Sequence, residues 1–271
     1  MKRKIKVGII GCGTIGREVA RACQARLNRR IDLIGICDSD AEKAKALQKV
    51  LKGKVQILDS VAIIKKSGLI VEAASAHVSC DIVKKCIRYK KDVLVMSVGG
   101  LLGKRGLLST IRRSPSTVYL PSGALCGLDG IKAASIGGIR SARITTRKPP
   151  RSLEGAPYIT QNKIDVKAID KETVIFEGTA REAIAAFPQN INVAAVLSLA
   201  SVGEDETKVR IITSPEYTKN VHEVEVEGDF GKITTRTENV PSERNPKTSW
   251  LAILSAIATL ERIVDNVRIG T

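Results

Sequence analysis

The chain has 271 residues and a mass of 29.2 kDa, which suggests about two domains that can each bury a core. Hydrophobic residues make up 43% and charged residues 27%, which excludes a disordered or collagen-like chain, and no apolar run reaches the roughly 18 residues of a membrane span. The net charge of +16 favours an acidic partner such as a nucleic acid, an anionic membrane or a polyanionic small molecule.

The first 120 residues alternate short apolar runs with amphipathic segments. We predict strands at residues 5–10, 33–37, 69–72, 93–97 and 117–120, and helices after residue 14 and at 41–51, 78–89 and 107–113. Strands that alternate with helices of this length are typical of βαβ units on a parallel sheet. The N-terminal part is therefore predicted to be a Rossmann-type α/β domain.

After Pro121 the pattern changes, and strands follow one another with helices set apart. We predict strands at residues 141–147, 173–176, 208–213, 221–227 and 232–237, with a hairpin turn at 228–231, and helices at 127–136, 180–187 and 191–201. This order indicates an α+β domain with an open, largely antiparallel sheet. A last helix is predicted from Asn245 as N-cap and Pro246 as first residue, with Trp250, Ile253, Leu254, Ile257, Leu260 and Val264 on one face.

The expected division of the chain is therefore a dinucleotide-binding domain over residues 1–122 and an α+β catalytic and dimerisation domain over residues 123–245. The helix within residues 246–271 is expected to pack back on the first domain.

The strongest local motif is Gly11-Cys12-Gly13-Thr14-Ile15-Gly16, which follows the first strand and opens a helix. In such a motif the first glycine permits a tight turn, the second lets backbone approach a pyrophosphate, and the third lets helix and strand touch. The helix N-terminus then offers free N–H groups to the phosphates. We predict a dinucleotide site here.

An acidic residue at the end of the second strand completes this motif. Asp38 lies where a carboxylate accepts a hydrogen bond from a ribose 2′-hydroxyl. Asp40 follows, and two carboxylates would repel a 2′-phosphate, which favours NAD over NADP as the cofactor. Ala74 and Ser75, after the third strand, are expected beside the same ligand.

Two histidines, His77 and His222, are the only side chains that titrate near neutrality without perturbation. His77 is either a polar residue at a helix start or a neighbour of the nicotinamide. In the segment 221–227 a period of two places His222 on the apolar face with Val224 and Val226, and the glutamates on the other. The imidazole therefore points to a core partner or into a cleft.

Other polar residues stand where ligands commonly bind. Asn190 precedes the helix at 191–201 and is either its N-cap or a ligand contact. Lys247, in the expected first turn of the last helix, is either a solvated surface lysine or a grip for a carboxylate. Residues 122–124 end a strand at the junction of the domains, where open α/β sheets bind ligands.

The cysteines are Cys12, Cys23, Cys37, Cys80, Cys86 and Cys126. They form no C-x-x-C pair and no set with histidine at the spacing of a zinc site, so we expect no bound metal. We interpret them as buried free thiols, which indicates that the protein works in the reducing cytoplasm. The basic N-terminal residues are interrupted by Lys6, and we expect no secretory signal.

With these segments assembled, the sequence resembles the L-aspartate dehydrogenase family of NAD biosynthesis over nearly its whole length. The motifs that carry the resemblance are residues 11–16, 121–125, 127–130, 148–150, 187–195, 220–223 and 245–249. Cys126 stands where the family often has glycine.

The resemblance implies a homodimer that oxidises L-aspartate with NAD or NADP to iminoaspartate, which yields oxaloacetate and ammonia or feeds quinolinate synthesis. It places the catalytic role on His222 and dinucleotide contacts on Ala124 and Asn190. Such a reaction needs a base for the substrate amine and for water, and fixed donors for two carboxylates. We expect those donors at Asn192, Lys247 and Lys148.

Three other functions remain open at this stage. A homoserine-dehydrogenase-like or dihydrodipicolinate-reductase-like enzyme would share the architecture. An NADH-sensing DNA-binding protein would use the +16 charge, but the basic residues form no dense stripe and aromatics are only 3%, so we expect no nucleic-acid partner. The last is an NAD-binding scaffold without activity.

Overall fold

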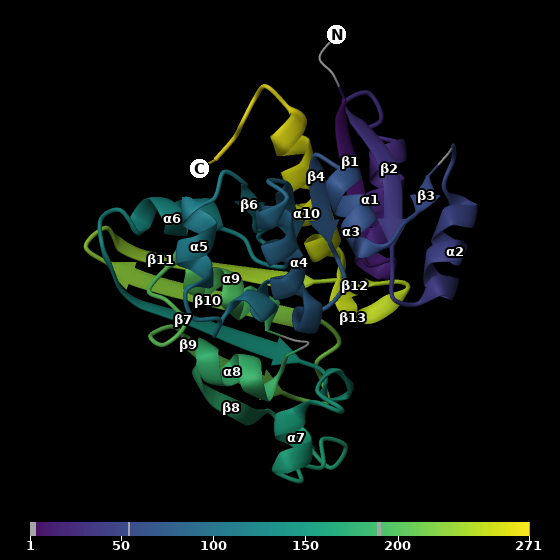
Figure 1. Ribbon diagram of the computed structural model, residues 1–271. Coiled ribbons are helices and arrows are strands. Elements are labelled where there is room, and N and C mark those ends of the chain that lie inside the picture. The colour runs from purple at the N-terminus through teal and green to yellow at the C-terminus, as the bar shows by residue number, and fades with distance from the viewer. Residues whose placement is uncertain (1–3, 54, 189–190, 271) are drawn as a thin grey trace. The chain divides into compact units, whose positions relative to one another are not determined.

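The computed structural model describes residues 4–53, 55–188 and 191–270, without the side chains of 246 and 247 (Figure 1). The chain divides into two compact units. Unit 1 comprises Met1–Pro121 and Ile253–Arg268, and unit 2 comprises Ser122–Ala252 and Ile269–Thr271. Among the described residues, no helix is long and apolar enough to cross a bilayer.

Unit 1 contains a parallel six-stranded sheet in the order β3-β2-β1-β4-β5-β6 (Figure 1). Its strands are β1 (Ile5–Ile10), β2 (Ile31–Cys37), β3 (Gln56–Ile57), β4 (Leu69–Glu72), β5 (Asp92–Val95) and β6 (Val118–Tyr119). The predicted parallel domain is confirmed; the two-residue strand β3 is too short for a periodicity signal.

The helices of unit 1 connect these strands. They are α1 (Thr14–Gln24), α2 (Ala41–Val50), α3 (Ser60–Lys66), α4 (Ala76–Arg88), the 3-10 turn η1 (Val98–Leu101) and α5 (Leu107–Arg113). Short acidic side chains cap two of them: Asp40 accepts from the amides of Glu42 and Lys43 at α2, and Asp59 does the same for Val61 and Ala62 at α3.

The last helix, α10 (Trp250–Val264), supplies part of the core of unit 1. Ala256 and Leu260 are fully buried in a cluster with residues of β1, β2 and α1. At the surface, the guanidinium of Arg26 forms a bidentate pair with Glu261, at 2.9 to 3.1 Å. This end of the chain is therefore held by apolar packing, by this forked ion pair and by a second pair between Arg30 and Asp265 at 2.9 Å.

The predicted start of this helix is wrong. Residues Asn245–Ser249 form strand β13, which pairs with β12 (Pro241–Ser242), and the amide of Trp250 donates to the carbonyl of Val240. A backbone engaged in a ladder cannot also supply a helical N-cap, so Asn245 is not one. The predicted apolar face is also partly wrong, since Leu254 is 42% exposed.

Unit 2 contains a mixed, largely antiparallel five-stranded sheet in the order β11-β10-β7-β9-β8, in which only the pair β7–β9 is parallel. Its strands are β7 (Ile139–Lys148), β8 (Thr173–Thr179), β9 (Lys208–Thr213), β10 (Asn220–Gly228) and β11 (Gly231–Asn239). The predicted α+β sheet and the hairpin turn at 228–231 are confirmed.

Helices of unit 2 cover one face of this sheet. They are α6 (Leu128–Ala134), the 3-10 turn η2 (Pro150–Ser152), α7 (Pro157–Gln161), α8 (Ala180–Ala186) and α9 (Asn192–Ala200). Helix α9 packs on β7 and α8 on β8 and β9, around a core that includes Phe176 and Phe187. The core-facing side chains of β7 and β10 point to these helices, because alternate residues of a strand share a face.

We expect Leu260→Ala to lower the free energy of unfolding by about 2–5 kcal/mol, because truncation leaves a cavity in a packed core. Urea denaturation measures the effect. Leu254→Ala, on the same helix but 42% exposed, is the matched control and should change the free energy much less. Equal effects of the two substitutions would contradict the placement of α10.

Candidate functional site

The glycine motif forms the turn between β1 and α1, and its three glycines meet different constraints. Gly11 has φ +105°, and a Cβ there would lie 2.3 Å from the backbone of Ala73. A Cβ on Gly16 would lie 1.8 Å from the carbonyl oxygen of Gly11. Gly13 has open space where its Cβ would point. Two glycines thus serve packing, and the third leaves room for a ligand at the start of α1.

Asp38 ties the end of β2 to this turn. Its Oδ2 accepts from the amide of Cys12 at 2.6 Å, and its Oδ1 accepts from the amide of Asp40 at 2.9 Å. The carboxylate of Asp40 is engaged as the cap of α2. Asp38 is therefore the acidic group of this edge that both orders the glycine turn and faces the adjoining cavity.

That cavity has a volume of about 630 Å³ and lies at the carboxyl ends of β1, β2 and β4. The predicted residues that line it are Gly11, Gly13, Asp38, Ala74 and Ser75. The lining also includes the cations Lys43 and Lys85 and the carboxylates Asp59 and Asp81, which the motif did not reveal. The cavity suits a phosphate-bearing ligand with a hydroxylated sugar.

Cys12, Thr14, Ile15 and Gly16 lie in the turn and first helical turn but not in the cavity lining. Burial raises the pKa of the Cys12 thiol to about 12, with the Asp38 charge as a second cause. The thiol therefore stays protonated and donates to the carbonyl of Cys37 at 3.6 Å, while the backbone N–H of the same residue binds Asp38.

Glu72 is a residue of this edge that the sequence analysis missed. It ends β4 with no exposed surface, and burial raises the pKa of its carboxyl group. Its oxygens accept from the amide of Ala74 at 2.8 Å and from the amide and hydroxyl of Ser97 at 3.0 and 2.9 Å. Glu72 thus fixes the loops after β4 and β5. The available signal was an acidic residue directly after the apolar run 69–71.

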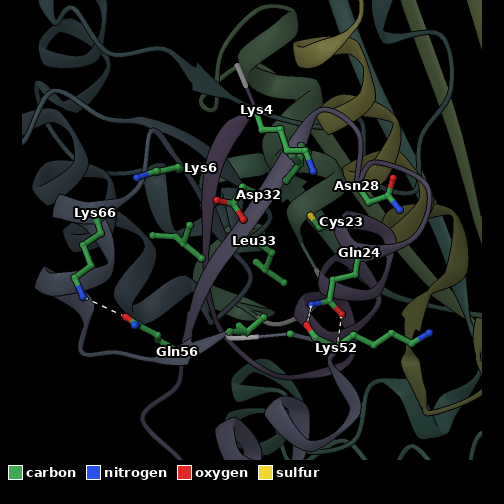
Figure 2. A pocket seen from close by; sticks show the side chains of 14 residues that line it. Lys4, Lys6, Cys23, Gln24, Asn28, Asp32, Leu33, Lys52, Gln56 and Lys66 are labelled. Atoms are coloured by element: carbon green, nitrogen blue, oxygen red, sulfur yellow. Dashed lines mark hydrogen bonds between the residues drawn. The ribbon is translucent and has the colours of Figure 1, made fainter. Parts of the chain in front are cut away.

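A larger cavity of about 730 Å³ lies at the amino ends of β1 and β2 (Figure 2). Among the described residues, four lysines line it, and Gln24 closes one side through hydrogen bonds with the backbone of Lys52. The lining lysines are Lys4, Lys6, Lys52 and Lys66. Because the glycine turn and Asp38 are at the opposite edge of the sheet, this cavity is not the dinucleotide site.

The inner face of the unit 2 sheet changes from apolar to polar along its strands. Val226 and Val224 on β10 are fully buried in the apolar core, and His222 and Asn220 continue the same face. In the register, His222 pairs with Thr146 of β7 and Thr237 of β11, and Asn220 pairs with Asn239. The register therefore gathers a polar cluster at one end of the sheet.

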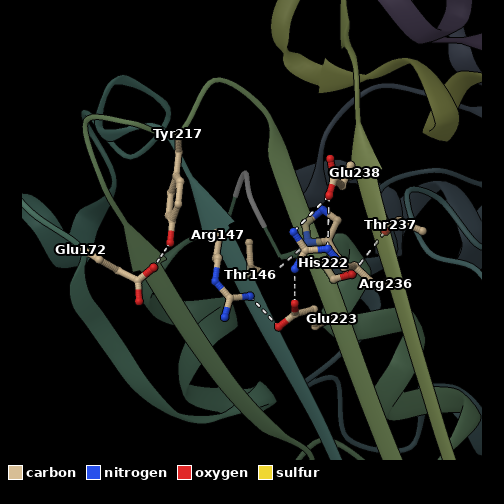
Figure 3. Close-up of polar contacts among 9 residues, drawn as sticks. All are labelled: Thr146, Arg147, Glu172, Tyr217, His222, Glu223, Arg236, Thr237 and Glu238. Carbon is tan, nitrogen blue, oxygen red and sulfur yellow. Dashed lines mark hydrogen bonds and ion pairs between the residues drawn. The ribbon is translucent and has the colours of Figure 1, made fainter.

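His222 is 4% exposed, and Thr146 Oγ1 lies 2.9 Å from its Nδ1 (Figure 3). Nε2 has no hydrogen bond to any described residue. When Nδ1–H donates to the Thr146 hydroxyl, Nε2 carries the lone pair and can take a proton. The imidazole thus lies on the inner face of the sheet, as expected, at the end of that face where the side chains are polar.

Burial, with the charge of Lys148 as a second cause, lowers the pKa of His222 to about 3. Lys148 is 5% exposed, and burial lowers the pKa of its ammonium to about 8. At neutral pH the imidazole is therefore neutral, while Lys148 is mainly cationic.

The segment around Ala124 packs over β11. The Ala124 carbonyl accepts from Thr237 Oγ1 at 2.9 Å and from Asn239 Nδ2 at 3.3 Å, and Asn239 Oδ1 accepts from Ser249 Oγ at 2.8 Å. Two of the motifs that carry the resemblance, near residues 124 and 249, thus meet on one strand next to His222.

On the outer face, Arg147 pairs with Glu223 at 2.5 Å, and Arg236 bridges Glu223 and Glu238 (Figure 3). These pairs join β7, β10 and β11 one residue from the Thr146–His222 contact. They help to hold the register on which the inner cluster depends.

The structure places the remaining predicted site residues in several different positions. Asn190 lies outside the described residues, and the N-cap position of α9 belongs to Ile191. Asn192 is the first residue of α9. Lys247 lies in β13, so its predicted place in a helical turn is wrong, and His77 is exposed in the first turn of α4. Within the described chain, no group of three or more His, Cys, Asp or Glu residues could hold a metal.

Gly13→Ala tests the cofactor cavity. We expect the variant to keep its thermal stability, since its Cβ meets open space, and to bind NADH roughly tenfold more weakly, since backbone can no longer approach the pyrophosphate. Fluorescence titration measures this affinity. Gly16→Ala is the contrast, with lower stability because its Cβ meets the Gly11 carbonyl. Unchanged NADH affinity in Gly13→Ala would refute the assignment.

The lowered pKa of His222 has a consequence for stability. The pKa of His222 in the folded protein, about 3, lies below its ordinary value of 6.5, so the contribution of the neutral imidazole to stability is full above pH 6.5 and is lost as the pH falls toward 3. We expect His222→Gln to lose less stability than wild type over this window, by at most about 1.4 kcal/mol per pH unit. Urea denaturation between pH 7 and 4 measures it. The exposed His77→Gln should follow wild type; if His222→Gln does so too, the imidazole is not buried.

Comparison with known proteins covers nearly the whole chain. Residues 11–121 match the model "Homoserine dehydrogenase, NAD binding domain", and residues 129–263 match "Aspartate dehydrogenase, C-terminal". The L-aspartate dehydrogenase of Methanococcoides burtonii is 46% identical, covering 98% of this chain and 100% of the relative. That of Nitrosopumilus maritimus is 40% identical, covering 98% and 99%.

Among solved structures, the aspartate dehydrogenase of Thermotoga maritima superposes with a TM-score of 0.78 at 26% identity, covering 99% of this chain and 100% of that one. The homoserine dehydrogenase match concerns the dinucleotide-binding domain alone, whereas the C-terminal match and the full-length relatives agree with each other. With its nicotinamide-dinucleotide domain and its buried histidine on an antiparallel sheet, the chain belongs to the L-aspartate dehydrogenase family.

Proposed function

We propose that this protein oxidises L-aspartate to iminoaspartate with His222 as the acid/base, and that the product feeds NAD biosynthesis through quinolinate or hydrolyses to oxaloacetate and ammonia. The observation that carries the proposal is the buried, neutral imidazole of His222, held through Nδ1 by Thr146 with Nε2 unbonded among the described residues. The family membership supplies the substrate class.

The residues of unit 1 fit a nicotinamide dinucleotide. Gly13 and the N-terminus of α1 would take the pyrophosphate, and Asp38 a ribose hydroxyl. Glu72 would hold the Ala74–Ser75 loop against the ligand. When bound, the cofactor supplies the acceptor for the hydride that leaves the substrate Cα. Asp38 and the absence of an arginine directly after it favour NAD, with NADP as the second possibility. Contacts from Ala124 and Asn190 remain part of the proposal.

His222 would act on two protons in succession. Nε2 would first take a proton from the substrate ammonium, because only the neutral amine supports departure of the hydride. After that first proton has been released to solvent, the neutral Nε2 would take a proton from the water that attacks the imine carbon. Thr146 would hold the ring in the tautomer that leaves Nε2 available.

The dicarboxylate needs fixed positive groups. Lys148 is the best placed, since it is buried next to His222 and perturbs the pKa of that imidazole. We keep Lys247 and Asn192 as further contacts. The protein is proposed to work as a homodimer in the cytoplasm, and the free state of its six cysteines is consistent with a reducing compartment.

We expect His222→Ala to lose at least about 100-fold in kcat for aspartate while its affinity for NAD stays unchanged, because a positioned general base contributes on the order of 10²–10⁴. Steady-state kinetics and NAD titration measure the two quantities. The matched control is His77→Ala, an exposed histidine in unit 1, which should keep wild-type turnover.

Near wild-type turnover by His222→Ala would overturn the catalytic assignment. Turnover of homoserine but not aspartate by the wild-type protein would overturn the proposed substrate. A substrate panel with NAD separates these results.

A further inference from the structure

Unit 2 contains a cavity of about 220 Å³ beside the polar cluster. It is formed where the turn after β7, the start of β10 and the β12–β13 hairpin meet. Its polar lining residues are Arg151, Ser152, Thr218, Asn220 and Asn245. The volume lies below the roughly 300 Å³ at which pockets for drug-sized ligands begin, and it suits a small metabolite.

Asn220 is the lining residue that points to a ligand. It is 6% exposed, and its Oδ1 is completely buried without a hydrogen-bond partner among the described residues. Buried side-chain oxygens are nearly always hydrogen-bonded, so a lone one next to a cavity calls for a donor from outside the protein. The broad, roughly two-fold torsion of an amide lets this oxygen turn toward the cavity.

Asn220 lies close to His222, the proposed acid/base, on the same strand. It precedes His222 by two residues on β10, so both side chains share the inner face of the sheet. The last pair of the β7–β10 ladder is Arg147 with Val221, and Lys148 and Asn220 each lie one residue beyond it. A ligand in contact with Asn220 therefore lies two residues, roughly 7 Å, along the strand from the imidazole.

The charged residues around the cavity indicate which group the ligand carries away from Asn220. Among the described residues that line it, none is acidic, and Arg151 supplies a cation at an exposed position. Lys148 is buried directly before Pro149 of the lining. Guanidinium groups pair with carboxylates in a forked geometry. The cavity thus combines a cation for a carboxylate with an acceptor for an amine.

From this arrangement we propose that Asn220 Oδ1 accepts a hydrogen bond from the α-amino group of the substrate and that Arg151 pairs with its side-chain carboxylate. Asn220 is then the residue that selects an amino acid over the same dicarboxylate without its amine. The inference rests on the proposed function and adds two specificity-determining contacts to it.

The test compares aspartate with succinate, which lacks the amine, by calorimetric titration into the full-length protein saturated with NADH, so that no turnover occurs. We expect Asn220→Ala to weaken aspartate roughly tenfold or more and to leave succinate unchanged, because a hydrogen bond to a charged group is lost. Asn220→Asp keeps an acceptor oxygen and should restore the preference for aspartate.

Arg151→Gln should weaken both ligands, since both carry the carboxylate. The matched control is Arg143→Gln, an exposed arginine that alternates away from the inner face on β7, and it should weaken neither. A general structural effect of Asn220→Ala would lower both affinities together, whereas the proposal requires their ratio to change.

Equal losses for aspartate and succinate in Asn220→Ala, or no loss in either, would overturn the role of Asn220. An unchanged affinity in Arg151→Gln would overturn that of Arg151. If wild-type protein neither binds nor oxidises aspartate, the proposed function itself fails. If it does both and the variants match it, only this inference fails.

Discussion

Protonation of an imidazole that is removed from water costs a large amount of free energy, and His222 is such an imidazole in this protein. Its burial is set by the register of three strands, in which Thr146 and Thr237 are its direct neighbours. The nearby ammonium of Lys148 disfavours a second positive charge. The proposed base is therefore neutral because of where the sheet places it, and the same placement sets the limits on what can bind beside it.

The register is in turn held from the opposite face. Arg147, Glu223 and Arg236 form ion pairs across β7, β10 and β11, one residue away from the inner cluster. A slip of one residue would move His222 to the charged face and bring a glutamate into the core. Apolar packing of Val224 and Val226 opposes the same slip. Both faces of the sheet thus specify one arrangement of the site.

In unit 1 the comparable constraint is the convergence of loops at the carboxyl ends of parallel strands. Two carboxylates organise these loops. Asp38 binds the glycine turn, and Glu72 binds the loops after β4 and β5. The basic excess of the chain is distributed in a similar way over several places, including the rim of the cofactor cavity and the four lysines of the larger cavity (Figure 2). This distribution suits small anionic ligands better than one continuous polyanion.

Local patterns in the sequence determined the features that depend on neighbouring residues. The period of two placed His222 on the inner face, and the glycine spacing with Asp38 located the dinucleotide turn. Strand and helix types followed from apolar periodicity in both units. The start of the last helix was misjudged because Asn245-Pro246 is a favourable helix start by itself, and only pairing with β12 makes it a strand.

The tertiary structure alone decided which distant groups meet. Thr146 and His222 are 76 residues apart, and Glu72 and Ser97 are 25 apart. The burial of Lys148, the unpartnered oxygen of Asn220 and the contact of Ala124 with Asn239 are likewise products of strand order and loop packing. A sequence pattern reports the face on which a residue lies, whereas pKa and hydrogen-bond partners depend on what other strands bring to that face, and this is why the chemistry of the site emerged only with the fold.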